Sequence, residues 1–451
     1  MTYQKKNTTT LDNPSNAINN QIAVLTQKML GESANNINQI KVLARKAFDK
    51  NGLPKPKDEE YRYTDIVSSL KQVFDFSSDI PTTEVSDVDR FQTHPIYKEN
   101  VYIIGLINGQ MTPELCVLPD KKTGIIITTI EEGINTFPKE VESVFGQIAN
   151  IETDNFVSMN TMLTKTGVFI QVKENVVPDK PIVFMNFIDS SKGNAIIHPH
   201  NICKIGENSE ISIIELYEES GTFPVFTNSV TEILADNNSK IHHFKLQNFH
   251  DQNIHIDNTA ISAQRDAIIN TYTFSFKGKI IRNNLNILLE QENSEAHLYG
   301  LYIANNKSLI DNHTIVDHKA PKCFSNEKYK GIMDDYSKGV FNGKIYVRPN
   351  AQTTNAFQSN HNILLSTTAK IYAKPQLEIW ADDVKCTHGC TTGQINKDHL
   401  FYLRSRGISE HDARTLLLQA FASDIMDKVN IPFLKAKISR IIKTRLHPQN
   451  N

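Results

Sequence analysis

The segment Ser209-Glu-Ile-Ser-Ile-Ile214 returns several times along the chain in similar form. In each copy a small residue stands two places before an apolar one, and an alternation of residue types follows. The other copies are Ser239-Lys-Ile-His-His-Phe244, Ala267-Ile-Ile-Asn-Thr-Tyr272, Ser294-Glu-Ala-His-Leu-Tyr299, Gly343-Lys-Ile-Tyr-Val347 and Ala369-Lys-Ile-Tyr-Ala373. The first four begin 30, 28 and 27 residues apart, and the last two 26 apart. A repeat of this length with a short strand in each unit predicts a solenoid, because a single unit cannot bury its apolar side.

We therefore expect residues 165–390 to form a parallel β-helix. Polar turns such as Gly206-Glu-Asn-Ser209 and Asp236-Asn-Asn-Ser239 precede several copies, and Asn and Gly readily take left-handed conformations in turns. The alternative is an antiparallel β-sandwich with long loops. Tight Asn-Gly or Asp-Gly turns between successive strands would favour the sandwich, and this segment contains only Asn342-Gly343.

The start of the chain has the periodicity of helices. Apolar residues recur at helical spacing, and we expect helices over Ala17–Leu30, Ile37–Phe48 and Asp58–Leu70. These define a helical region over residues 1–95, followed by a β-rich core over 96–392 in which the β-helix is clearest from residue 165. Helical interruptions of the core are expected at Pro138–Asn150 and Asn155–Leu163.

The end of the chain, residues 393–451, is expected to be a second helical region. Ser409-Glu-His-Asp412 has the form of a capping box that opens a helix. Ile431-Pro432 begins a last helix that carries several Lys and Arg residues. The expected order is therefore a helical start, a β middle and a helical end.

Composition excludes several classes of function. The 451 residues include 48 basic and 50 acidic ones, for a formal net charge of -2, so no general basic field attracts nucleic acid or anionic lipid. No apolar run approaches the ~18 residues that a membrane-spanning helix needs, and Met1–Thr8 lacks the apolar stretch of a secretory signal. Five scattered cysteines argue against a disulfide framework. These features predict a soluble protein of the cytoplasm.

Candidate metal ligands gather near the end of the β region, in Cys386-Thr-His-Gly-Cys390. On an extended strand, Cys386, His388 and Cys390 would leave the same face, and thiolate with imidazole suits iron, zinc or copper. The alternative is a set of small buried residues, since free cysteine behaves as a small hydrophobe. A closed zinc site needs four ligands, so an incomplete site that borrows ligands from another chain fits this run better.

A nucleotide-hydrolysing motif is absent from the sequence. Gly339-Val-Phe-Asn-Gly-Lys-Ile345 is one residue short of the phosphate-binding loop spacing and lacks the hydroxyl that holds magnesium. We therefore expect this chain to bind no nucleotide.

Several motifs in the last third of the chain resemble the SufB/SufD family of iron-sulfur cluster assembly proteins. They are Tyr329-Lys-Gly-Ile332, Gly339–Ile345, Ala351-Gln-Thr-Thr354, Gln358–Ser366 and Leu377-Glu-Ile379. The pieces Ala381–Gly389 and Leu400–Ile408 look like the SufD branch of the family. Earlier pieces, such as Glu60-Tyr-Arg-Tyr-Thr64, fit more loosely.

The resemblance implies a right-handed parallel β-helix between two helical regions. It also implies a non-catalytic scaffold subunit that pairs with a SufB-like subunit through the β-helix and docks a SufC-like ATPase through the C-terminal helices, with a homodimer as a possible form of the isolated chain. A transient iron-sulfur cluster would be shared with the SufB-like subunit. His388 would bind it at that interface, with Cys386 as a second ligand.

One residue departs from the family pattern. The family usually has a small residue such as Ala where this chain has Cys390, which either adds a ligand or replaces one small side chain by another. Two other functions remain open on the sequence: a SufB-like scaffold that holds a cluster alone, and a β-helix polysaccharide lyase or hydrolase.

Overall fold

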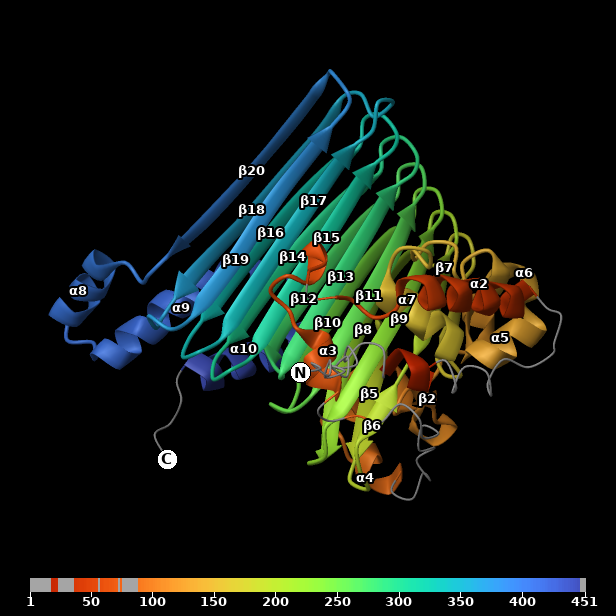
Figure 1. Cartoon of the computed structure of the whole chain (residues 1–451), viewed down its shortest axis with the longest axis horizontal. Coiled ribbons are helices and arrows are strands. Elements are labelled where there is room, and N and C mark those ends of the chain that lie inside the picture. Colours follow the sequence, from red (N-terminus) through yellow and green to blue (C-terminus); the bar gives the residue numbers. More distant parts are fainter. Residues whose placement is uncertain (1–17, 23–35, 56, 72–73, 75–87, 447–451) are drawn as a thin grey trace, which may run out of the picture.

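The structure, a computed structural model, describes residues 18–22, 36–55, 57–71, 74 and 88–446. Its centre is a solenoid in which the chain passes alternately through two facing ten-stranded sheets (Figure 1). The strands of the solenoid pair in parallel, which confirms the predicted parallel β-helix and excludes the sandwich. Antiparallel pairs occur only among the first strands of the described chain, β1 with β2 and β3 with β4.

The two sheets have the following strands. Sheet A contains β1 (Tyr102–Ile107), β2 (Gln110–Met111), β5 (Ile182–Ser190), β8 (Glu210–Gly221), β10 (Lys240–Asn248), β12 (Ile268–Lys277), β14 (Glu295–Ala304), β16 (Phe324–Met333), β18 (Thr354–Leu364) and β20 (Val384–Gly393). Sheet B contains β3 (Ile125–Thr129), β4 (Val168–Val172), β6 (Ala195–Ile197), β7 (His200–Ile205), β9 (Val225–Ala235), β11 (Ile254–Ala263), β13 (Ile280–Leu289), β15 (Leu309–His318), β17 (Lys338–Val347) and β19 (Lys370–Ile379).

The first four repeat copies lie in register in sheet A. Ser209, Ser239, Ala267 and Ser294 each come directly before a strand, and all four are buried. The strands that follow pair from their first residues, with Lys240 opposite both Glu210 and Ile268. The spacing read from the sequence therefore corresponds to one turn of the solenoid.

The last two repeat copies were aligned wrongly. Ala369 comes directly before β19, but Gly343 lies inside β17 and faces Pro375. Lys338 pairs with Lys370, so the true counterpart of Ala369 is Ser337. Because side chains alternate with a period of two, a shift by an even number of residues keeps the same face inward and leaves the pattern looking correct.

The polar turns take the left-handed conformation that the sequence predicts. Asn208, Asn238 and Asn293 have φ values of 57°, 52° and 63°. The Asn208 N–H donates to the carbonyl of Asn237 in the next turn at 3.0 Å, and the Asn238 amide donates to Asn208 Oδ1 at 2.9 Å. These bonds connect successive turns of the solenoid at its corner.

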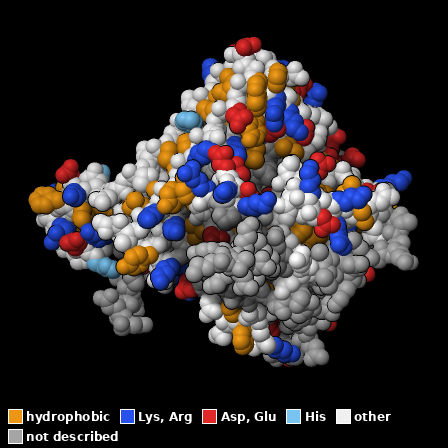
Figure 2. Space-filling model, viewed as in Figure 1, with side chains coloured by type: hydrophobic (Ala, Val, Ile, Leu, Met, Phe, Trp, Pro, Cys, Tyr) orange, Lys and Arg blue, Asp and Glu red, His pale blue; other side chains and the backbone are white. Residues whose placement is uncertain are grey.

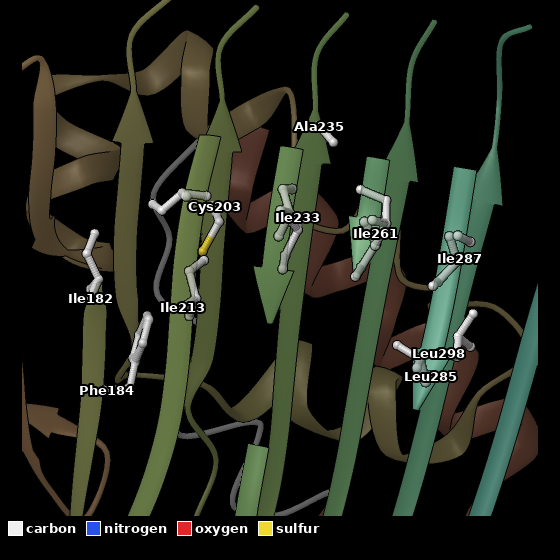
Figure 3. Close-up of a cluster of buried hydrophobic side chains, with 14 of the residues drawn as sticks. Ile182, Phe184, Cys203, Ile213, Ile233, Ala235, Ile261, Leu285, Ile287 and Leu298 are labelled. Atoms are coloured by element: carbon white, nitrogen blue, oxygen red, sulfur yellow. The ribbon is translucent and has the colours of Figure 1, made fainter. Parts of the chain in front are cut away.

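Most of the space between the sheets is apolar. Figure 3 shows side chains from both sheets pointing toward one another, among them Ile213 and Leu298 from sheet A and Ile233, Ile261 and Ile287 from sheet B. All five are buried. Full burial of each such side chain stabilises the fold by about 1.5–3 kcal/mol.

Charged side chains interrupt this core near the middle of the solenoid. Lys245 forms ion pairs with Asp257 across the gap between the sheets and with Glu215, at 3.8 Å, on its own sheet. His243 Nε2 lies 2.7 Å from Glu215 Oε1, and the Ser229 hydroxyl donates to Asp257 at 2.9 Å. Each charge therefore has a partner, as burial requires.

Helices cover the outer faces of both sheets (Figure 1). In the N-terminal part, α2 (Asn36–Asn51) packs on α7 (Asn155–Leu163), and α7 packs on β9 and β11 of sheet B. At the other end, α9 (Glu410–Met426) packs on β14 and β16 of sheet A, and α10 (Pro432–Leu446) packs on α9. The further helices are α3 (Ile66–Lys71), α4 (Val88–Gln92), α5 (Ile130–Thr136), α6 (Pro138–Glu142) and α8 (Lys397–Ser405).

The predicted helices agree with these elements in most places. The helix expected over Ile37–Phe48 is α2, whereas only residues 18–22 of the helix expected over Ala17–Leu30 lie within the described residues, and these are helical. The single helix expected over Asp58–Leu70 is divided into a 3-10 turn, Glu59–Tyr61, and α3. Thr64 lies between them, and its hydroxyl donates to Asp311 of sheet B at 2.6 Å. No helix in the described part of the chain is long and apolar enough to cross a membrane.

Replacing Lys245 by Ala should lower the free energy of unfolding by about 3–5 kcal/mol, because it leaves buried carboxylates without their cation. Urea denaturation measures the change. Lys240→Ala is the matched control on the same strand, since Lys240 pairs with Glu210 at 3.3 Å at the surface and its loss should cost less than about 1 kcal/mol. Equal losses for the two variants would contradict the assignment.

Candidate functional site

The candidate ligands lie on β20, the last strand of sheet A. This strand pairs with β18 on one side and has no second partner strand among the described residues. In Figure 1 it forms the outer edge of the solenoid. His388 and Cys390 are exposed, and Cys386 is half-buried. The candidate donors are therefore at an open end of the solenoid.

The three side chains share the face of β20 that continues the interior of the solenoid. In register, Cys386 faces Ala356, His388 faces Gln358 and Cys390 faces Asn360. Those three β18 residues are buried between the sheets, and residues opposite each other in paired strands point to the same side. The backbone is extended over the whole run, so the condition for same-face placement is met.

Neither thiol is activated in the isolated chain. Burial raises the pKa of Cys386, and the backbone hydrogen bond that involves Ala356 lowers it only in part. Burial also raises the pKa of Cys390, whose Sγ lies 3.8 Å from Asn360 Oδ1. Because a thiol binds metal as the thiolate, iron would have to displace a proton from either cysteine.

The donor set is incomplete within this chain. In the part of the chain that the structure describes, no three His, Cys, Asp or Glu side chains are grouped so that they could hold one metal ion. Other histidines have acidic partners of their own, such as His200 with Glu232 at 2.8 Å and His243 with Glu215. The open donors at the end of the solenoid are therefore those of β20.

Two buried polar residues, Gln358 and Glu327, occupy the positions equivalent to His388 in the two preceding turns and form a polar column behind it. Gln358 faces His388 on one side and Glu327 of β16 on the other. The Gln358 amide donates to Glu327 Oε2 at 2.8 Å. Gln358 is 3% exposed and Glu327 is 1% exposed.

The carboxyl of Glu327 has an unusually high pKa. Burial raises its pKa to about 7, and the polar side chains of Thr314 and Gln358 lower the pKa only in part. The strands around it present no cation: Lys328 and Lys330, its neighbours on β16, both pair with Asp424 of α9 on the outer face. Glu327 therefore exchanges its proton close to neutral pH.

Sequence motifs alone do not single out this column. Glu327 and Gln358 are 31 residues apart, and Gln358 faces His388 one turn later. These spacings are close to the repeat length, so a register counted from the repeats would have placed all three in one column. A glutamate on a strand is ordinarily expected to face solvent, so the sequence alone does not indicate that Glu327 is buried.

Two family profiles match this chain almost end to end. Residues 187–421 match the SUF system FeS cluster assembly, SufBD core domain, and residues 21–184 match the SufBD protein N-terminal region. The chain belongs to the SufBD family. Its role in iron-sulfur cluster assembly by the SUF system follows from this membership.

Similar proteins come from bacteria and plants. The chain is 29% identical to an iron-sulfur cluster assembly SufBD family protein of Synechocystis, over 87% of each protein. It is 28% identical to the iron-sulfur cluster assembly protein SufD of Escherichia coli, over 88% of this chain and 90% of SufD. Protein ABCI7, chloroplastic, of Arabidopsis thaliana is 29% identical over 83% of this chain and 79% of the plant protein. Membership of the SufBD family replaces the lyase or hydrolase alternative.

The stability of this SufBD protein should depend on pH through Glu327. Its pKa is raised from 4.5 to about 7 on folding, so the carboxyl stabilises the folded state fully below pH 4.5 and this contribution is lost as the pH rises to 7. The loss amounts to about 3 kcal/mol. Relative to the wild type, Glu327→Gln should therefore gain stability between pH 5 and 8.

Denaturation at a series of pH values measures this difference. Glu378→Gln is the control, because Glu378 is an exposed carboxylate on β19 near the same end of the solenoid. If Glu327→Gln followed the wild-type pH profile, Glu327 would not hold a proton in the folded protein near neutral pH.

Proposed function

We propose that this chain is a SufD-type scaffold subunit, which pairs with a SufB-like subunit and shares a transient iron-sulfur cluster with it. The observation that carries the proposal is the incomplete donor set on an exposed terminal strand. A chain that held the cluster alone would need further ligands close to His388, and the described residues do not supply them. The resemblance of Ala381–Gly389 to the SufD branch supports the SufD-type role over a stand-alone SufB-like scaffold.

Backbone geometry supports pairing through the end of the β-helix. The ten residues of β20 have an unpaired edge among the described residues, and an exposed edge strand is a template for pairing with another chain. Gly389 and Gly393 have no neighbouring atom within 4 Å of where a Cβ would lie, so the face of β20 at these positions is also uncovered. A second copy of this chain could pair through the same edge, so the proposal includes a homodimer as a form of the isolated protein.

The chemistry of the shared site follows from the residues present. His388 would supply an imidazole nitrogen and Cys386 a thiolate to iron, while the partner supplies the remaining ligands. Histidine in place of a thiolate lowers the negative charge around iron and raises the reduction potential of a cluster. Because each subunit would supply only a few ligands, the cluster could also be released to an acceptor. Cys390 lies on the same face, one alternate position further along the strand.

The C-terminal helices offer a docking surface for an ATPase subunit. Phe401 and Tyr402 of α8 are 74% and 57% exposed. Figure 2 shows hydrophobic side chains among charged ones at the left tip of the molecule, which α8 occupies in Figure 1. Exposed aromatic residues with a charged surround are typical of protein interfaces. Because this chain has no nucleotide motif, ATP hydrolysis belongs to the partner and the chain itself is non-catalytic.

Replacing His388 by Ala should lower the cluster yield of the assembled complex at least tenfold, while leaving folding and ATPase binding unchanged. Anaerobic reconstitution with iron and sulfide, followed by absorption spectroscopy, measures the yield. His297→Ala is the control, because His297 lies on β14 and pairs with Glu295 at 3.1 Å. An unchanged yield with His388→Ala would remove this residue from the site.

Replacing Phe401 and Tyr402 by Ser should weaken binding of the SufC-like ATPase at least tenfold, because it removes the exposed aromatic surface of α8. Titration calorimetry with the purified ATPase gives the affinity. Val177→Ser provides the comparison, since Val177 is 66% exposed and lies outside the C-terminal helices. Wild-type affinity of the double variant would place the docking surface elsewhere.

A further inference from the structure

A short segment near the start of the chain, Glu59–Thr64, lies across the outer face of sheet B (Figure 1). The Glu60 carbonyl accepts a hydrogen bond from Arg282 of β13 at 2.8 Å. The Glu60 carboxylate accepts a hydrogen bond from Asn342 of β17 at 3.0 Å and pairs with Lys344 of the same strand at 2.5 Å. We call this segment the strap, because it holds several strands of sheet B from outside.

The strap also reaches β19, the last strand of sheet B. The Tyr63 ring stacks on the Tyr372 ring of β19, with 4.0 Å between the ring centroids and 9° between the ring planes. Glu59 forms an ion pair with Lys374, two residues further along the same strand. Because Glu59 and Lys374 are both exposed, the ion pair contributes less than the aromatic stack. The two contacts fasten β19 to a part of the chain about 315 residues earlier.

The strand β19 has less support of other kinds than the strands before it. It pairs with β17 on one side and has no second partner strand among the described residues. Every residue of β19 is at least partly exposed, whereas most residues of β17 are buried. Strands with few buried contacts open locally at a low cost in free energy. Contacts on the outer face therefore have a large effect on how well β19 is ordered.

We propose that Tyr63 and Glu59 are positioning residues for partner pairing, which hold β19 extended and in register before a partner arrives. This inference rests on the proposed function, in which the far end of the β-helix pairs with a SufB-like subunit, since β19 is the edge of sheet B at that end. A strand that is already ordered loses less conformational entropy on association. Tyr63 and Glu59 contact side chains on the face of β19, so they leave its backbone edge open.

Hydrogen–deuterium exchange of the purified full-length chain tests whether the strap orders this strand. The amides of β19 should exchange at least tenfold faster in Glu59→Gln/Tyr63→Ala than in the wild type, because the exchange rate follows the local opening equilibrium. The amides of β12, which has partner strands on both sides, should exchange at the wild-type rate. An unchanged rate in β12 shows that the double variant keeps its fold.

Two further variants serve as controls for the exchange measurement. Tyr63→Phe keeps the stacked ring, so β19 should exchange as it does in the wild type. Phe223→Ala removes a ring that is 47% exposed between β8 and β9, and it should also leave β19 unchanged. Exchange of β19 at the wild-type rate in Glu59→Gln/Tyr63→Ala would show that the strap does not order this strand, and the inference would be overturned.

The affinity for the purified SufB-like subunit, measured by titration calorimetry, tests the positioning role. Glu59→Gln/Tyr63→Ala should bind at least threefold more weakly than the wild type, and Tyr63→Phe should bind with wild-type affinity. Faster exchange in β19 with an unchanged affinity would give the strap a purely structural role and overturn the inference. If the wild type itself did not bind the SufB-like subunit, the proposed function would fail together with the positioning role, and the exchange rates would still show whether the strap orders β19.

Discussion

Parallel stacking in register is the constraint on which the rest of this structure depends. Each residue of a strand lies opposite a residue one turn earlier and another one turn later. The residues at equivalent positions of successive turns therefore form much of the surroundings of each side chain. Ser209, Ser239, Ala267 and Ser294 follow one another at a corner in this way. Glu327, Gln358 and His388 do the same near the open end. The site is thus a product of the repeat and not of an inserted loop.

The same stacking explains how polar groups are tolerated inside the solenoid. Side chains from two sheets face each other across a narrow gap, so a charge on one sheet can find a partner on the other. Lys245 and Asp257 are an example. Glu327 has no such cation opposite it, and burial therefore raises its pKa to about 7. Asp257 and Glu327 therefore differ because the facing sheet supplies a cation to Asp257 and none to Glu327.

Much of the architecture could be predicted from the sequence, because the repeat length and the turn residues act locally. The Asn residues before the strands indicated left-handed turns, and φ values at Asn208 and Asn238 agree. The repeat copy predicted at Gly343 was wrong by six residues, because alternation cannot distinguish shifts by two, four or six residues. The same-face placement of Cys386 and His388 followed from alternation alone. The interior column did not, because a polar residue on a strand gives no sign of which face is covered.

The two ends of the solenoid differ in a way that limits how many copies can join. At the first end, sheet A finishes with β2, which has only two residues, and sheet B finishes with the antiparallel strand β3, on which α5 packs. Such ends offer little unpaired strand backbone to a second protein chain. Among the described residues, only the far end presents long bare edges, those of β20 in sheet A and β19 in sheet B, so two molecules that join there through both sheets leave no long edge free. Assembly through both edges is therefore self-limiting at two subunits, and a fibre cannot grow from it.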